Sequence, residues 1–201
     1  MIWFTSDTHF GHARIIELSN RPYRDVDEMN AKIANNWNKT VSPDDTVYHL
    51  GDVALGPLGQ SLSVVKRLNG YKVLVVGNHD RIFLGNKPAY VQRFLPLYEN
   101  VFDDIMEYGT ERIFLRAGLE SEGVLVSHFP YDGDHSDEDR FKEHRPVDAG
   151  ETLLHGHTHS PTRVSRSRMG TLQLHVGVDA WGYTPVSADK LLRIINTTRA
   201  A

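Results

Sequence analysis

The chain has 201 residues, of which 24% are charged and 40% hydrophobic, proportions that are ordinary for a globular protein and exclude extensive disorder. It has no cysteine, which excludes disulfides and thiolate metal sites, so any metal would need histidine, aspartate, asparagine or glutamate ligands. The formal net charge of −4 argues against binding along extended duplex nucleic acid but leaves small phosphorylated substrates open.

The first predicted element is a short buried strand over residues 2–5, which delivers Asp7 and His9 into a loop. Taken alone, these two residues fit an aspartate turn with a surface histidine as well as they fit a functional site. The start of the chain does not have the pattern of a signal peptide, and no apolar run is long enough to span a bilayer. We therefore expect a cytoplasmic protein with no membrane contact.

Two more predicted strands end in polar residues that follow a glycine. Residues 46–50 lead into Gly51 and Asp52, and residues 71–76 lead into the Gly-Asn-His-Asp segment of residues 77–80. Helical patterns separate the three strands, the first with an apolar stripe after residue 25 and the second over residues 61–69. This alternation favours a parallel sheet with crossover helices, in which ligands collect beyond the carboxyl ends of the strands.

The next part of the chain changes character. After a predicted helix over residues 88–97, short β-prone runs at 101–108, 112–117 and 123–127 favour hairpins over crossovers. The last run ends in His128, which by itself fits a histidine at a sheet edge equally well.

A polar segment over residues 131–146 predicts a solvated loop or a lid. Residues 153–155 then lead into Gly156, His157 and His159, where two closely spaced histidines favour a metal site over a solvated pair.

The chain closes with a predicted hairpin over residues 163–167 and 171–176 and a helix over residues 187–195. Asp179 and Trp181, between them, are candidates to line the entrance of a site. No internal repeat or linker divides the chain, so we expect a single domain over residues 1–201.

The polar residues form an ordered set along the chain. The set is Asp7-x-His9, Gly51-Asp52, Gly77-Asn78-His79, His128 and Gly156-His157-x-His159. It resembles the calcineurin-like metallophosphoesterase superfamily, and more narrowly its short phage and bacterial members, several of which cleave cyclic nucleotides. The resemblance implies an α/β fold, an α/β/β/α sandwich of two mixed sheets flanked by helices.

The resemblance also implies two divalent metal ions, with Mn²⁺ favoured and Fe or Zn²⁺ as alternatives. It assigns Asp7, His9, Asp52 and His159 to one ion, and Asp52, Asn78, His128 and His157 to the other. Carboxylates, imidazoles and one amide suit these metals, and a carboxylate such as Asp52 can bridge two ions as a histidine cannot. A hydroxide that bridges the ions would then attack phosphorus.

The remaining site candidates lie around this cage. By resemblance, His79 protonates the leaving oxygen or binds the phosphoryl group, and Asp80 orients the loop or a ligand. His12 and Arg14 are candidates to contact the substrate phosphate, although solvated loop positions fit them equally well. Many phosphatase members carry a carboxylate partner for the catalytic histidine where this chain has Leu55, which favours substrates with an easier leaving group.

The leading hypothesis is a phosphodiesterase that hydrolyses cyclic (2′,3′ or 3′,5′) or other small nucleotide phosphodiesters. A phosphomonoesterase or a nuclease would use the same core. A non-catalytic metal-binding scaffold is the alternative from a different class, but scaffolds of this kind lose ligands and this sequence retains all of them.

Overall fold

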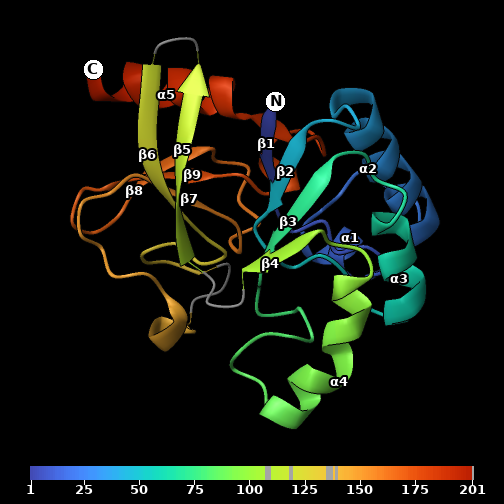
Figure 1. Cartoon of the computed structure of the whole chain (residues 1–201). Helices are drawn as coiled ribbons and strands as arrows, with labels where there is room; N and C mark the ends of the chain where they lie inside the picture. Colours follow the sequence, from blue (N-terminus) through green and yellow to red (C-terminus); the bar gives the residue numbers. More distant parts are fainter. Residues whose placement is uncertain (107–109, 118–119, 135–137, 139, 201) are drawn as a thin grey trace.

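The computed structural model describes residues 1–106, 110–117, 120–134, 138 and 140–200, which fold into two β-sheets with helices packed around them (Figure 1). The first sheet has the strand order β10-β1-β2-β3-β4. Its strands are β1 (Ile2–Thr5), β2 (Thr46–His49), β3 (Tyr71–Val75), β4 (Asp104–Met106) and β10 (Val186–Ser187). Strands β1 to β4 are parallel, as the alternation of strands and helices predicts for the first three, and β10 is antiparallel to β1.

Strand β4 corrects the sequence-based prediction. The run at residues 101–108 was expected to form a hairpin with the strand that follows it, but β4 pairs parallel with β3, with Leu74 opposite Ile105. Helix α4 (Pro88–Glu99) connects the two strands and makes this pair a further crossover unit. The signal was weak because β4 has only three residues.

The second sheet has the order β5-β6-β7-β9-β8 and is also mixed. Its strands are β5 (Thr110–Ala117), β6 (Glu120–Ser127), β7 (Leu153–His155), β8 (Val164–Arg166) and β9 (Leu172–His175). The hairpins β5–β6 and β8–β9 are antiparallel, as predicted, whereas β7 is parallel to both β6 and β9. The two mixed sheets confirm the fold class that the resemblance implies.

The helices are shorter or longer than their sequence patterns predict. Besides α4, they are α1 (Ile15–Leu18), α2 (Val26–Thr40), α3 (Leu58–Val65) and α5 (Ala188–Ala200), with 3-10 turns at Lys142–His144 and Val178–Ala180. Helix α3 begins directly after Pro57 and ends at Val65, so it both starts and ends earlier than the predicted span of 61–69. No helix in the described part of the chain is long and apolar enough to cross a membrane.

Two buried clusters hold the layers together. One lies between the first sheet and helices α2 to α4, and it includes the predicted stripe of Met29, Ile33 and Trp37. The other lies between the two sheets, where Phe4 and Leu174 belong to the same cluster, and α5 closes it. Figure 1 shows the sheets side by side with α2, α3 and α4 on the outer side of the first. The sheets therefore bring two sets of strand ends to one region.

Asp45 joins the beginnings of β1 and β2. The amino group of Met1, the backbone N–H of Ser42 and the indole N–H of Trp3 all donate to its carboxylate and lower its pKa to about 2. These bonds anchor the amino-terminal ends of β1 and β2, which lie at the opposite ends of these strands from the polar loops.

We expect Asp45→Asn to destabilise the fold by about 1 kcal/mol, because the charged acceptor is lost. Since the folded-state pKa is depressed below the usual value of 3.8, this contribution is present above that pH and disappears as the pH falls toward 2. Melting temperatures of both proteins, measured from neutral pH down to about pH 2, check the prediction. A difference that grows on acidification contradicts it.

Candidate metal centre

The predicted ligands come from five loops that meet at the carboxyl ends of β1, β2, β3, β6 and β7. Backbone bonds tie these loops together: the N–H of Asp7 donates to the oxygen of Gly51 (3.0 Å), and the N–H of His9 to that of Asp52 (3.1 Å). The N–H of His157 lies 3.1 Å from both carboxylate oxygens of Asp7. Ligand candidates 150 residues apart in sequence, such as Asp7 and His157, thus lie in one cluster.

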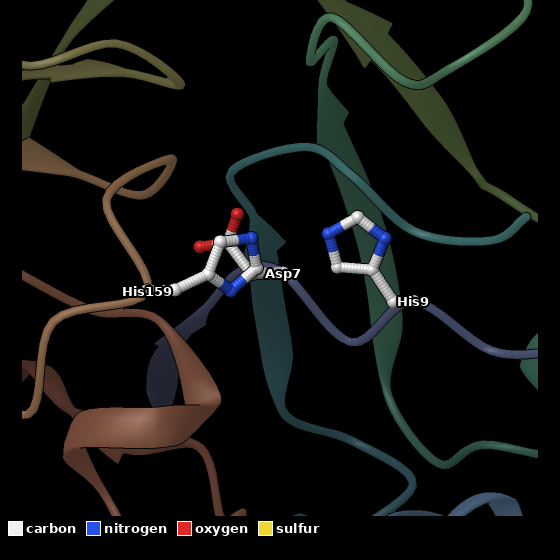
Figure 2. Close-up of side chains that lie close together, drawn as sticks. All are labelled: Asp7, His9 and His159. Carbon is white, nitrogen blue, oxygen red and sulfur yellow. The ribbon is translucent and has the colours of Figure 1, made fainter. Parts of the chain in front are cut away.

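One group of possible ligands consists of Asp7, His9 and His159, each of which offers an atom within 4.8 Å of the others. Figure 2 shows the His159 ring beside the Asp7 carboxylate, with His9 further along the same loop as Asp7. Nε2 of His9 is buried and has no hydrogen-bond partner within the described part of the chain. It lies 3.6 Å from Oδ2 of Asp52, so a cation between these groups would satisfy it.

A second group consists of Asp7, Asp52 and His128, again with ligand atoms within 4.8 Å of one another. Oδ1 of Asn78 adjoins it, 2.9 Å from Nε2 of His128 and 3.0 Å from Nδ1 of His157. Asp7 belongs to both groups, and Asp52 reaches from the second group toward the first, because its Oδ2 lies 3.6 Å from Nε2 of His9 while its Oδ1 lies 3.5 Å from Nε2 of His128. The donor set therefore fits two cations that share one carboxylate.

Five of these predicted ligands have a left-handed backbone conformation. The φ angles are 56° at Asp7, 49° at His9, 57° at Asp52, 69° at His157 and 50° at His159. Such angles are uncommon for residues other than glycine, and they concentrate where the surrounding fold can impose them for a functional reason.

The glycines that precede the ligands are required by space. A Cβ atom at Gly77 would lie 2.5 Å from Oδ1 of Asp52, and one at Gly156 would lie 2.7 Å from Oδ2 of Asp7. At Gly51, which has a φ of 85°, it would lie 2.8 Å from Nδ1 of His128. Each glycine thus leaves room for a ligand from another loop, which gives a physical reason for the glycine-ligand pattern in the sequence.

Asp80 lies beneath the cage and is fully buried. Its two oxygens accept hydrogen bonds from the backbone N–H groups of Gly77, Asp52 and Val53 at 2.9 to 3.1 Å. Burial and the charge of Asp52 raise its pKa to about 7. Asp80 was grouped with the catalytic candidates, but in this position it orients two ligand-bearing loops.

Asp7 and His9 have the protonation states that metal ligands need. Burial alone would raise the pKa of Asp7, but His175, whose Nε2 lies 3.8 Å away, and the charges of the other histidines hold it well below its usual value. Burial and the charges of His159 and Arg21 lower the pKa of His9 well below its usual value. An ionised carboxylate and a neutral imidazole are the forms that bind metals.

The two predicted substrate contacts differ in position. His12 adjoins the cage, with Nδ1 3.4 Å from Nδ1 of His9. Arg14 is exposed, and its side chain makes no hydrogen bond or ion pair with any residue that the structure describes. Among the described contacts, His12 thus adjoins a predicted ligand, whereas Arg14 has no such contact.

Arg21 is a site residue that the sequence did not reveal. Its side chain is fully buried and donates two hydrogen bonds of 2.9 Å to the carboxylate of Asp179. It also donates to the carbonyl oxygens of Asp7 and Thr8. Oδ2 of Asp179 in turn lies 3.0 Å from Nδ1 of His159, so Arg21 holds both a ligand loop and the partner of a ligand histidine.

The expected entrance residues are buried. The Asp179 side chain is only 7% exposed, and its carboxylate binds Arg21 and lies 3.0 Å from Nδ1 of His159. Trp181 is a core residue whose indole N–H donates to the carbonyl oxygen of His175. The expectation that these two residues line an entrance is therefore wrong, because the turn after β9 packs inward.

We predict that Gly77→Ala lowers the number of Mn²⁺ ions bound per chain, because the added methyl group displaces the Asp52 carboxylate. Gly59→Ala in α3 is the matched control, since a Cβ there meets nothing within 4 Å. Elemental analysis after gel filtration measures the bound metal. Equal metal content in the two variants would refute the steric explanation.

The sequence matches the model of the calcineurin-like phosphoesterase superfamily domain over residues 1–182. The Gene 66 protein of Mycobacterium phage L5 is 42% identical over 199 residues, which cover 96% of this chain and 93% of the phage protein. An uncharacterized protein of Methanocaldococcus jannaschii, MJ1445, is 29% identical over 96% of this chain and 90% of its own length.

A solved structure extends the likeness to three dimensions. The protein of unknown function AQ665 from Aquifex aeolicus has a TM-score of 0.68 and 26% sequence identity, covering 96% of this chain and 98% of that chain. The family match spans every predicted metal ligand, from Asp7 to His159. The chain therefore belongs to the calcineurin-like phosphoesterase superfamily, whose members are metal-dependent phosphoesterases.

Proposed function

We propose that this protein is a dinuclear metal-dependent phosphodiesterase, and that its substrates are cyclic or other small nucleotide phosphodiesters. The observation that carries the proposal is the cage in which two buried carboxylates, Asp7 and Asp52, lie among histidines. With both carboxylates ionised, two divalent cations would leave the inner site positive. A small phosphate ester can then be attracted although the whole chain has a formal charge of −4.

The same residues would hold the ions in the assignment given by the resemblance, with Asp52 shared. Bound there, two divalent ions would activate a water molecule and neutralise charge on the phosphoryl oxygens. Mn²⁺ is the favoured metal, and Fe and Zn²⁺ are the alternatives that the ligand set also suits.

The charges around the cage favour a diester over a monoester. A phosphate monoester carries a charge of about −1.5 to −2 at neutral pH, whereas a diester carries one negative charge. Arg21 and Arg140, which lie near the ligand histidines, are paired with Asp179 and Asp134. Their positive charge is therefore compensated before a substrate binds.

His12 adds no positive charge at neutral pH. Burial and the nearby positive groups, His79 first among them, lower its pKa to about 4. A neutral imidazole beside the cage can exchange a hydrogen bond with a phosphoryl or sugar oxygen. His12 is thus better suited to orient a singly charged ester than to neutralise a doubly charged one.

His79 has the position of a proton donor to the leaving oxygen. Its side chain is exposed, its ring centre lies 5.5 Å from that of His9, and its backbone N–H donates to Oδ1 of Asp52 (2.8 Å). Among the described residues it forms no ion pair with a carboxylate, which agrees with Leu55 at the position where many phosphatase members of the superfamily carry an acid. An imidazole without such a partner is suited to a leaving group that needs only modest protonation.

The test is a substrate panel assayed with the chelated and Mn²⁺-loaded protein. We expect faster turnover of a bis-aryl than of a mono-aryl phosphate ester, and turnover of 2′,3′- or 3′,5′-cyclic nucleotides. A preference for the mono-aryl ester would identify a phosphomonoesterase, and digestion of single-stranded nucleic acid a nuclease. Full metal loading without turnover of any ester would indicate a binding module.

We predict that His79→Asn lowers kcat much more for an alkyl than for a phenolic leaving group, because an alkoxide needs the proton. General acid catalysis contributes about 10²- to 10⁴-fold, and the loss for the alkyl ester is expected in this range. Metal content should equal that of the wild type. If turnover of both esters fell by the same factor, His79 would not be the acid.

A further inference from the structure

Asp134, in the polar segment over residues 131–146, reaches the predicted metal centre. Residues 135–137 and 139 of this segment lie outside the described part of the chain. The side chain of Asp134 is completely buried, and its Oδ1 lies 3.2 Å from Nε2 of His157. Burying a carboxylate costs free energy unless it is paired with a counter-charge. The expectation of a solvated loop does not explain why Asp134 is buried.

Arg140 compensates the charge of Asp134. Its Nη2 lies 3.1 Å from Oδ1, while its Nε and backbone N–H both lie 3.2 Å from Oδ2. Arg145 supports the pair from behind, because it donates to the carbonyl oxygens of Gly133 and Arg140. The carboxylate is therefore fixed in place by its own segment.

The two nitrogens of His157 face different groups. Nδ1 lies 3.0 Å from Oδ1 of Asn78, on the side of the cage, and Nε2 faces Asp134. A carboxylate beside one ring nitrogen keeps the proton there and leaves the lone pair of the other nitrogen available to a cation. Asp134 thus fixes both the tautomer and the orientation that metal binding through Nδ1 needs.

The other histidine of the Gly-His-x-His segment has a similar arrangement on its opposite side. Nδ1 of His159 adjoins Asp179, which Arg21 holds in turn. Both histidines therefore have an aspartate-arginine pair behind them, but the two pairs come from separate parts of the chain. This separation allows each pair to be tested alone.

We propose that Asp134 is a positioning residue for His157, held by Arg140, and that these two residues belong to the site for one of the two metal ions. This proposal adds two residues to the metal centre, and it rests on the proposed function. It concerns metal affinity rather than turnover, so it can fail or succeed independently of the substrate.

The test is calorimetric titration of the metal-free full-length protein with Mn²⁺. For Asp134→Ala we expect the affinity for one ion to fall by about 10- to 100-fold, the range typical of lost partners of metal-bound histidines, while the other ion binds as in the wild type. Asp179→Ala should weaken the other ion. Glu143→Gln is the matched control, because this carboxylate of the same segment is 73% exposed and should leave both affinities unchanged.

A double-mutant cycle separates positioning from general damage to the fold. Arg140→Met should weaken the same ion as Asp134→Ala, and the double variant should be no weaker than Asp134→Ala alone. The visible absorption of the Co²⁺-loaded protein should change for one site only.

Three results would overturn the proposal: wild-type affinity for both ions in Asp134→Ala, equal weakening of both ions, or additive effects of the two substitutions. If metal binding behaves as expected but no ester is hydrolysed, the proposal stands and the proposed function fails.

Discussion

Two fully buried carboxylates, Asp7 and Asp52, impose the constraint on which the rest of the site depends. Within the described part of the chain, neither forms an ion pair with a lysine or arginine, and the groups that lie within 4 Å of their oxygens as possible ion-pair partners are histidines. Buried negative charge is stable only with a counter-charge, and divalent cations supply it here most simply. This requirement explains why parallel strands end close to Asp7 and Asp52, and why glycines and histidines surround these two carboxylates.

Close approach of the loops has a structural cost. Five ligand residues take left-handed backbone angles, each of which costs of the order of 1 kcal/mol or more for a residue other than glycine. The cost is sustained because backbone bonds between loops, the carboxylate of Asp80 and the guanidinium of Arg21 over-determine the conformation. A rigid cage of this kind places ligand atoms before the metal arrives, which lowers the reorganisation needed for catalysis.

Much of the fold and of the cage could be predicted from the sequence, because strand ends, glycines and ligands are local features in a fixed order. Residues such as Arg21 could not, since its partner Asp179 lies 158 positions away and no local pattern marks a buried arginine. Asp134 could not be singled out either, because it lies in a polar segment that was predicted to be a solvated loop or a lid. The parallel pairing of β4 was missed because a three-residue strand has almost no periodicity.

We propose above that the chain binds two divalent ions that share Asp52. Electron paramagnetic resonance of the protein loaded with two Mn²⁺ per chain tests it most directly. We expect the signal of an exchange-coupled pair in the wild type and its loss in Asp52→Asn. Two uncoupled ions in the wild type, or an unchanged coupled pair in the variant, would contradict it.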